Sequence, residues 1–146
     1  MSRFRLSSKS ISKMSGVHPD MAKVVKRAIE LTAIDFTVLY GLRTVEEQRE
    51  LYARGRTKPG AIVTWTMNSA HLRGHAVDLG VIIGHDYING DTQEELQFYN
   101  QVANAMLQAA AELDIPIVWG GVWKSNPDSG HFELNKAFYK GNKRNV

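Results

Sequence analysis

Three residues of types that bind zinc stand at two places in this chain of 146 residues. His71 and Asp78 belong to the run 69–78, and His131 belongs to the run 128–134. Imidazole nitrogens and carboxylate oxygens are good zinc ligands, and a catalytic zinc uses three protein ligands and leaves a fourth position for water. Since the first run supplies two ligands, His131 is the best candidate for the third.

The elements around these residues predict an α+β fold, a single domain over residues 1–146 in which helices pack on a small, mostly antiparallel sheet. The first run opens with small and polar residues and ends in an apolar, β-branched stretch, which indicates a loop leading into a buried strand. The strands are expected at 35–41, 76–83, 115–120 and 131–134. One helix is expected to begin near Pro19, and two others are expected to cover 44–54 and 92–113.

Several local signals refine this outline. Thr44 and Glu47 have the spacing of a capping box at a helix start. Asn89-Gly90 is a strong turn signal and predicts a short hairpin. Residues 1–16 are polar and rich in serine and lysine, so we expect them to be extended or poorly ordered. Trp65 interrupts a polar loop, and we expect it to cover the core rather than to serve as a platform for substrate.

Composition limits the possible classes. The sequence has no cysteine, so a metal would be held by nitrogen and oxygen. An apolar fraction of 43% and a charged fraction of 23% are ordinary for a globular protein. There is no apolar run of about 18 residues, so no integral membrane segment is expected. The net charge of +3 is a mild excess, and without a recognised motif it does not favour nucleic-acid binding.

The remaining histidines have ordinary explanations. His18 precedes a helix and is expected at its cap or on the surface. His85 lies in a polar loop, where we expect it to be exposed. His75 stands at the edge of a predicted strand, and the looped position of His71 makes His71 the better ligand.

The ordered motifs carry a family resemblance. Ser-x-His-x-x-Gly-x-Ala-x-Asp at 69–78, followed by Asp-x-x-His-Phe-Glu-Leu at 128–134, resembles the zinc peptidases of the D-alanyl-D-alanine carboxypeptidase type. These belong with the lysostaphin-like and hedgehog-like enzymes in a wider superfamily. The chain is most similar to bacteriophage endolysins of the L-alanyl-D-glutamate peptidase kind. Two further motifs extend the resemblance over most of the chain: Gly41-Leu42-Arg43-Thr44 with Glu47-Gln48, and Trp119-Gly120-Gly121 with Trp123-Lys124.

The resemblance assigns roles residue by residue. It implies that His71, Asp78 and His131 bind Zn²⁺. Asp128 matches the catalytic acid/base of the family. Arg43 matches an arginine that engages the substrate near the scissile carbonyl.

Three other positions follow from the same resemblance. Ser69 matches the serine of the motif and is expected to orient the loop or the substrate, and Trp123 is expected to contact the substrate. Val122 stands where such enzymes commonly have aspartate, so a polar contact of the family is missing here.

The function that the resemblance implies is hydrolysis of the L-alanyl-D-glutamate bond in the stem peptide of bacterial peptidoglycan. Zinc would activate water and polarise the amide carbonyl. The alternatives are a D-alanyl-D-alanine carboxypeptidase or dipeptidase, a non-catalytic wall-binding module, and a zinc-stabilised structural domain. No signal peptide is recognisable, so we expect a phage lysin that stays in the host cytoplasm until a membrane pore releases it to the wall. We also expect a monomer.

Overall fold

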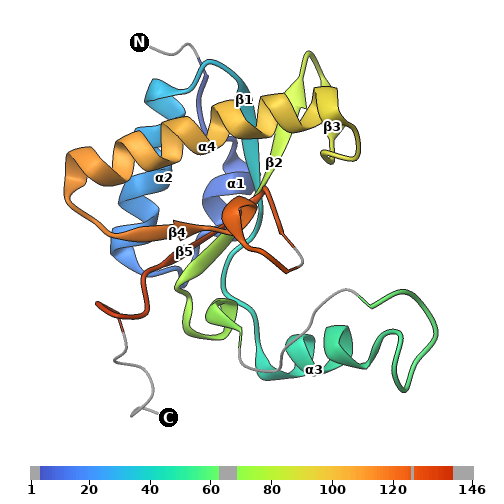
Figure 1. Ribbon diagram of the computed structural model, residues 1–146. Helices are drawn as coiled ribbons and strands as arrows, with labels where there is room; N and C mark the ends of the chain where they lie inside the picture. The colour runs from blue at the N-terminus through green and yellow to red at the C-terminus, as the bar shows by residue number, and fades with distance from the viewer. Residues whose placement is uncertain (1–3, 63–68, 126, 140–146) are drawn as a thin grey trace.

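The computed structural model describes residues 4–62, 69–125 and 127–139 (Figure 1). Its α-helices are α1 (Ser8–Lys13), α2 (Pro19–Leu31), α3 (Val45–Ala53) and α4 (Gln93–Leu113). Its strands are β1 (Asp35–Tyr40), β2 (Ala76–Ile83), β3 (Asp86–Ile88), β4 (Ile117–Trp119) and β5 (His131–Leu134). Two short 3₁₀ helices are η1 (Ala70–Arg73) and η2 (Gly120–Val122). The predicted Trp65 contact and the basic tail from residue 140 onward lie outside the described residues.

The named strands form one antiparallel sheet, which confirms the predicted α+β class. The strand order is β1-β2-β5-β4, and β3 pairs with β2 beyond the end of β5. β2 is therefore the central strand. In its register Asp78 lies opposite Tyr40 on one side and opposite His131 on the other.

Side-chain alternation along β2 separates the core from the opposite face of the sheet. Val77, Leu79 and Val81 are buried in the apolar core. Since successive side chains of a strand point to opposite faces, Asp78 lies on the other face. Phe132, the partner of Val77 in β5, is fully buried on the core side. The core thus fixes the face on which Asp78 and His131 are presented.

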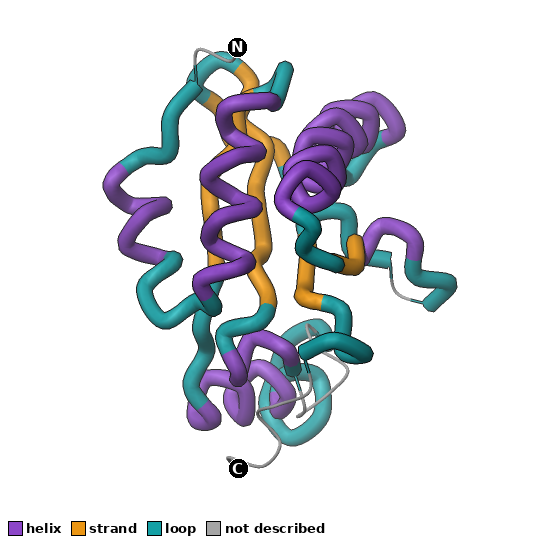
Figure 2. The backbone as a smooth tube through the Cα atoms, turned by 90° about the vertical axis from the view of Figure 1, so that its left-hand side faces the viewer, coloured by secondary structure: helices purple, strands orange, loops and turns teal. Residues whose placement is uncertain are grey.

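Helices α2 and α4 supply the other half of the core. They pack against each other, as Figures 1 and 2 show from two directions. Each helix has an apolar face at helical spacing, and its buried residues are Met21, Val24, Val25, Ala28 and Ile29 in α2, and Tyr99, Val102, Ala103, Ala105, Met106, Ala109 and Ala110 in α4. Leu96 and Phe98, which share the expected stripes of α4, are partly buried. Both starts are capped, because His18 Nδ1 accepts from Asp20 N and Thr92 accepts from Glu95 N. The cap on α2 confirms one of the two places expected for His18.

Helix α1 corrects the expectation of an extended start. Ser7 caps it by accepting from Ser10 N, and the fully buried Ser10 ties it to the outer edge of β1. Ser10 Oγ accepts from Val38 N at 2.9 Å and lies 3.0 Å from Thr37 Oγ1. These tertiary contacts hold a helix that its polar composition did not predict.

The hairpin between β2 and β3 is present, but its turn was predicted at the wrong place. Gly84 and His85 make the turn, and Gly84 has φ +66°. A Gly at the first position of a two-residue loop is itself a hairpin signal. Asn89-Gly90 follows β3 and begins the connection to α4. His85 is exposed, as expected.

No helix among the described residues is both long and apolar enough to cross a membrane. The capping box of α3 is confirmed, with Thr44 Oγ1 accepting from Glu47 N and Glu47 accepting from Thr44 N. α3 and residues 54–62 lie below the sheet in Figure 1, away from α2 and α4.

The glycine at the end of η1 is predicted to be irreplaceable. Gly74 has φ +72°, and a Cβ there would overlap the carbonyl oxygen of Gly16. Gly74→Ala combines left-handed strain with this backbone overlap, so we expect a loss of about 3 kcal/mol in the free energy of unfolding. Gly84→Ala is the matched control, because φ is also positive there but nothing lies within 4 Å. It should cost about 1 kcal/mol in urea unfolding. Equal losses in the two variants would contradict the packing argument.

Candidate metal centre

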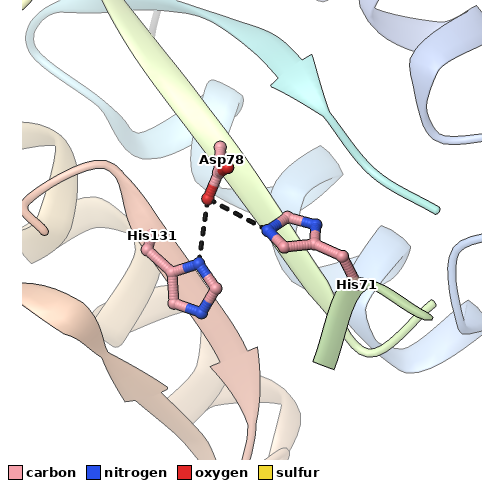
Figure 3. A group of neighbouring side chains, drawn as sticks. All are labelled: His71, Asp78 and His131. Atoms are coloured by element: carbon pink, nitrogen blue, oxygen red, sulfur yellow. Dashed lines mark hydrogen bonds and ion pairs between the residues drawn. The ribbon is translucent and has the colours of Figure 1, made fainter. Parts of the chain in front are cut away.

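Three elements bring together the side chains predicted to bind zinc. His71 stands on η1, Asp78 on β2 and His131 at the start of β5 (Figure 3). Asp78 Oδ1 lies 3.2 Å from His71 Nε2 and 2.9 Å from His131 Nδ1. The two imidazoles therefore flank one carboxylate oxygen. Both histidines are buried, and Asp78 is partly buried.

The three groups fit a zinc ion in both chemistry and spacing. One ligand atom from each residue lies within 4.8 Å of the others. In tetrahedral zinc sites with ligand bonds of about 2.0 Å, neighbouring ligand atoms stand about 3.3 Å apart. The distances from Asp78 Oδ1 to His71 Nε2 and to His131 Nδ1 are close to that spacing. The donor set is two nitrogens and one oxygen, which leaves room for a fourth ligand.

Both histidines are oriented by a second contact on the ring nitrogen that faces away from Asp78. His71 Nδ1 lies 2.8 Å from the carbonyl oxygen of Gly41. Because a carbonyl oxygen only accepts, Nδ1 carries the hydrogen, and the Nε2 of a neutral ring keeps its lone pair. His131 Nε2 lies 2.7 Å from Glu133 Oε1. Glu133 belongs to the motif at 128–134, but sequence reasoning gave it no role.

The charges in this cluster are strongly coupled. Burial opposes ionisation of Asp78, but hydrogen bonds from His131 and His71 outweigh it and hold the pKa of Asp78 well below its usual range. Burial also opposes the charged form of His131, but hydrogen bonds to Asp78 and Glu133 raise its pKa to about 9. The carboxylates thus create an environment that favours positive charge between them.

Asp128 lies on the turn that leads into β5. Its side chain is exposed, and its Oδ1 accepts from Gly130 N at 3.2 Å. The backbone holds the turn, because Asp128 N donates to Gly120 O and His131 N donates to Asp128 O. Surrounding protein and the negative charge of Asp78 raise the pKa of Asp128. An exposed carboxylate with a raised pKa beside a metal centre is suited to proton transfer.

Arg43 reaches the same centre from the end of β1. Its backbone N donates to His71 O at 2.9 Å, and its Nη2 lies 3.9 Å from Asp78 Oδ2. Its Nη1 donates to Gln48 Oε1 at 2.7 Å. Gln48 is the buried residue of α3, and its part in orienting Arg43 was missed. A fully buried glutamine among the charged residues of this helix is recognised only once burial is known.

Two other predicted residues lie beside the histidines. Ser69 Oγ accepts from His71 N at 3.1 Å and so caps η1. This supports the expectation that Ser69 orients the loop. The ring of Trp123 lies 5.0 Å from that of His131 and is 36% exposed. Val122, at the position of the family aspartate, is 66% exposed.

His75 is placed outside the triad. Its ring lies 5.4 Å from the ring of His18 and 6.0 Å from that of Tyr139. It is buried, and burial together with the charge of His18 lowers its pKa. His75 therefore packs between the start of α2 and the last described residues.

Comparison with known proteins decides the family. The model of the family described as phage L-alanyl-D-glutamate peptidase matches residues 1–145. The chain belongs to this family. The L-alanyl-D-glutamate peptidase of Escherichia phage T5 is 31% identical over 139 residues, which cover 94% of each chain. The peptidoglycan L-alanyl-D-glutamate endopeptidase CwlK of Bacillus subtilis is 32% identical over 82% of this chain and 74% of its own length.

Solved structures agree with this assignment. The L-Ala D-Glu endopeptidase ChiX of Serratia marcescens has a TM-score of 0.80 at 34% identity, with 93% of both chains covered. The vancomycin-resistance D,D-dipeptidase VanXYg has a TM-score of 0.55 at 20% identity, over 88% of this chain and 55% of its own. The second likeness shows a shared fold. Together they confirm the predicted D-Ala-D-Ala-peptidase-like architecture.

The cap on η1 yields a test of what Ser69 does. Ser69→Ala removes the acceptor for His71 N, so we expect a loss of about 1 kcal/mol in the free energy of unfolding. Ser69→Thr keeps the hydroxyl and should recover most of it. Urea unfolding of the metal-free variants measures the effect. A raised KM with unchanged stability would instead assign Ser69 to the substrate.

Proposed function

We propose that this chain is a zinc peptidase that hydrolyses the L-alanyl-D-glutamate bond in the stem peptide of bacterial peptidoglycan. One observation carries the proposal: His71, Asp78 and His131 converge in a zinc-compatible arrangement within a chain of this peptidase family. The names of the phage T5 enzyme, CwlK and ChiX support the choice of bond.

The residues divide the chemistry between them. His71, Asp78 and His131 would hold the zinc ion, which when bound supplies a Lewis acid that polarises the amide carbonyl and acidifies water. Asp128 accepts a proton from the attacking water and passes it to the leaving amine.

Arg43 provides positive charge at the same centre. Its guanidinium donates to Gln48, and the whole side chain is 13% exposed. A planar guanidinium fork can bind a carboxylate or stabilise a developing oxyanion. We assign it to the scissile carbonyl or a nearby substrate carboxylate. Trp123, partly exposed beside His131, is assigned to the substrate surface.

The biological setting that we propose is lysis of a bacterial host by a phage. A monomer would accumulate in the host cytoplasm and reach the wall when a pore opens in the membrane. The phage T5 relative supports this setting. A D-alanyl-D-alanine carboxypeptidase or dipeptidase is the alternative, and the shared fold of VanXYg makes it worth testing.

The cleaved bond can be read from the products. Purified peptidoglycan digested with the protein should give stem fragments that begin with D-glutamate, while L-alanine remains on the glycan. Mass spectrometry of the separated muropeptides detects both. Products that lack only terminal D-alanine would favour the carboxypeptidase alternative. Intact muropeptides under conditions of full zinc occupancy would favour a binding module.

Two aspartates can be used to separate metal binding from proton transfer. Asp78→Asn should lose zinc on dialysis, because an amide is a weaker ligand than a carboxylate. Asp128→Asn should retain zinc but cleave about 10²–10⁴-fold more slowly, since general acid–base catalysis contributes that much. Zinc content by mass spectrometry and initial cleavage rates measure the two effects.

The parent protein treated with a chelator and then with zinc is the control, and its activity should be lost and restored. An Asp128→Asn variant as fast as the parent would remove Asp128 from the mechanism. An Asp78→Asn variant with full zinc occupancy would remove Asp78 from the ligand set.

A further inference from the structure

Glu133 faces the metal centre from behind His131. The two residues are separated by one position in β5, so both point to the same face of the sheet. Glu133 Oε1 lies 2.7 Å from His131 Nε2, and the Glu133 side chain is 13% exposed. Its neighbour across the ladder is the fully buried Ala76. A carboxylate placed there needs a polar partner, and His131 supplies it.

We propose that Glu133 is a positioning residue that keeps the hydrogen of His131 on Nε2 and so presents the Nδ1 lone pair to the metal ion. The inference rests on the proposed function, because it assigns a role toward the zinc ion. It names the atom by which His131 binds and the group that selects it.

The argument follows from the chemistry of the ring. A neutral imidazole has one N–H donor and one lone pair, whereas an ionised carboxylate only accepts. The short contact to Glu133 holds a hydrogen on Nε2 in both the charged and the neutral ring. Nδ1 shares its hydrogen with Asp78 Oδ1, 2.9 Å away, and a bound metal ion would displace that hydrogen and take the Nδ1 lone pair. This nitrogen faces the point where the three ligand atoms meet.

His71 shows the same arrangement with the nitrogens exchanged. The carbonyl of Gly41 holds the hydrogen on Nδ1, so Nε2 is the ligand atom. The two rings thus bind through different nitrogens, and each is fixed by an acceptor outside the centre. A charged acceptor makes a stronger hydrogen bond than a carbonyl, and such outer partners also raise the basicity of a histidine ligand. Glu133 should therefore strengthen His131 as a zinc ligand.

The test compares zinc affinity in three variants of the full chain. Glu133→Ala removes the acceptor, and zinc should bind about 10–100-fold more weakly, the range found for lost outer partners of metal ligands. Glu133→Gln keeps an acceptor oxygen without the charge and should give an intermediate affinity. Glu94→Gln, an exposed glutamate in the first turn of α4, is the matched control and should bind zinc like the parent. Competition with a chromophoric chelator measures the dissociation constants.

Two further measurements distinguish positioning from a merely structural role. Nitrogen–proton NMR correlation of the zinc-loaded parent should show the His131 hydrogen on Nε2. In the zinc-loaded Glu133→Gln variant, the chemical shift of this Nε2 hydrogen should change. Urea unfolding of the metal-free variants reports stability separately. A stability loss with zinc affinities within twofold of the parent would overturn the inference, as would a His131 hydrogen on Nδ1 in the parent. If Glu133→Ala does not fold, Glu133→Gln decides by affinity and NMR signal.

The outcomes also separate this inference from the proposed function. A parent that binds no zinc would refute both. A parent that binds zinc and cleaves peptidoglycan, together with unchanged affinity in both Glu133 variants, would refute the role of Glu133 alone.

Discussion

The proposed metal centre depends on one strand register, the antiparallel pairing of Asp78 in β2 with His131 in β5. A slip by one residue would turn Asp78 into the apolar core and carry Val77 or Leu79 to the open face. The burial of these two side chains and of Phe132 therefore protects the register. The burial of the core and the placement of the proposed ligands therefore depend on the same strand register.

Around that pairing, the structure orients each side chain through a neighbour. Two hydrogen bonds join the segment after β1 to η1, since the carbonyl oxygen of Gly41 accepts from the His71 side chain and the backbone N of Arg43 donates to His71 O. Ser69 caps η1, and Gln48 anchors the guanidinium of Arg43. A ligand held on both sides loses little conformational freedom when an ion binds, which favours a centre that is formed before binding.

The sequence was informative where a pattern is local. The buried strand at 76–83, the capping box at Thr44 and the helices from Pro19 and over 92–113 each depend on neighbours in the chain, and each was predicted correctly. The three ligand types also lie within recognisable motifs, although the convergence of His131 on Asp78 required the fold. What could not be predicted depends on contacts between distant segments.

Three residues illustrate this limit. Ser10 belongs to a helix that forms because it docks on β1, and its polar sequence gives no sign of that. Gln48 looks like one more polar residue until burial shows that it faces Arg43. Strand alternation correctly places Glu133 on the same face of the sheet as His131, but its contact with Nε2 of His131 depends on side-chain rotamers. The hairpin turn at Gly84 was missed for another reason, because a stronger dipeptide signal lay five residues further on.

The docking of α1 has a consequence for how the protein behaves at high concentration. An open strand edge offers unpaired amide and carbonyl groups to which a second copy can add, and this is a common start of aggregation. At β1, the hydroxyl of Ser10 already takes the outward amide of Val38, and the helix covers the strand around it. At Val38, the outer side of β1 therefore offers a second copy less backbone to pair with than an uncovered edge strand would.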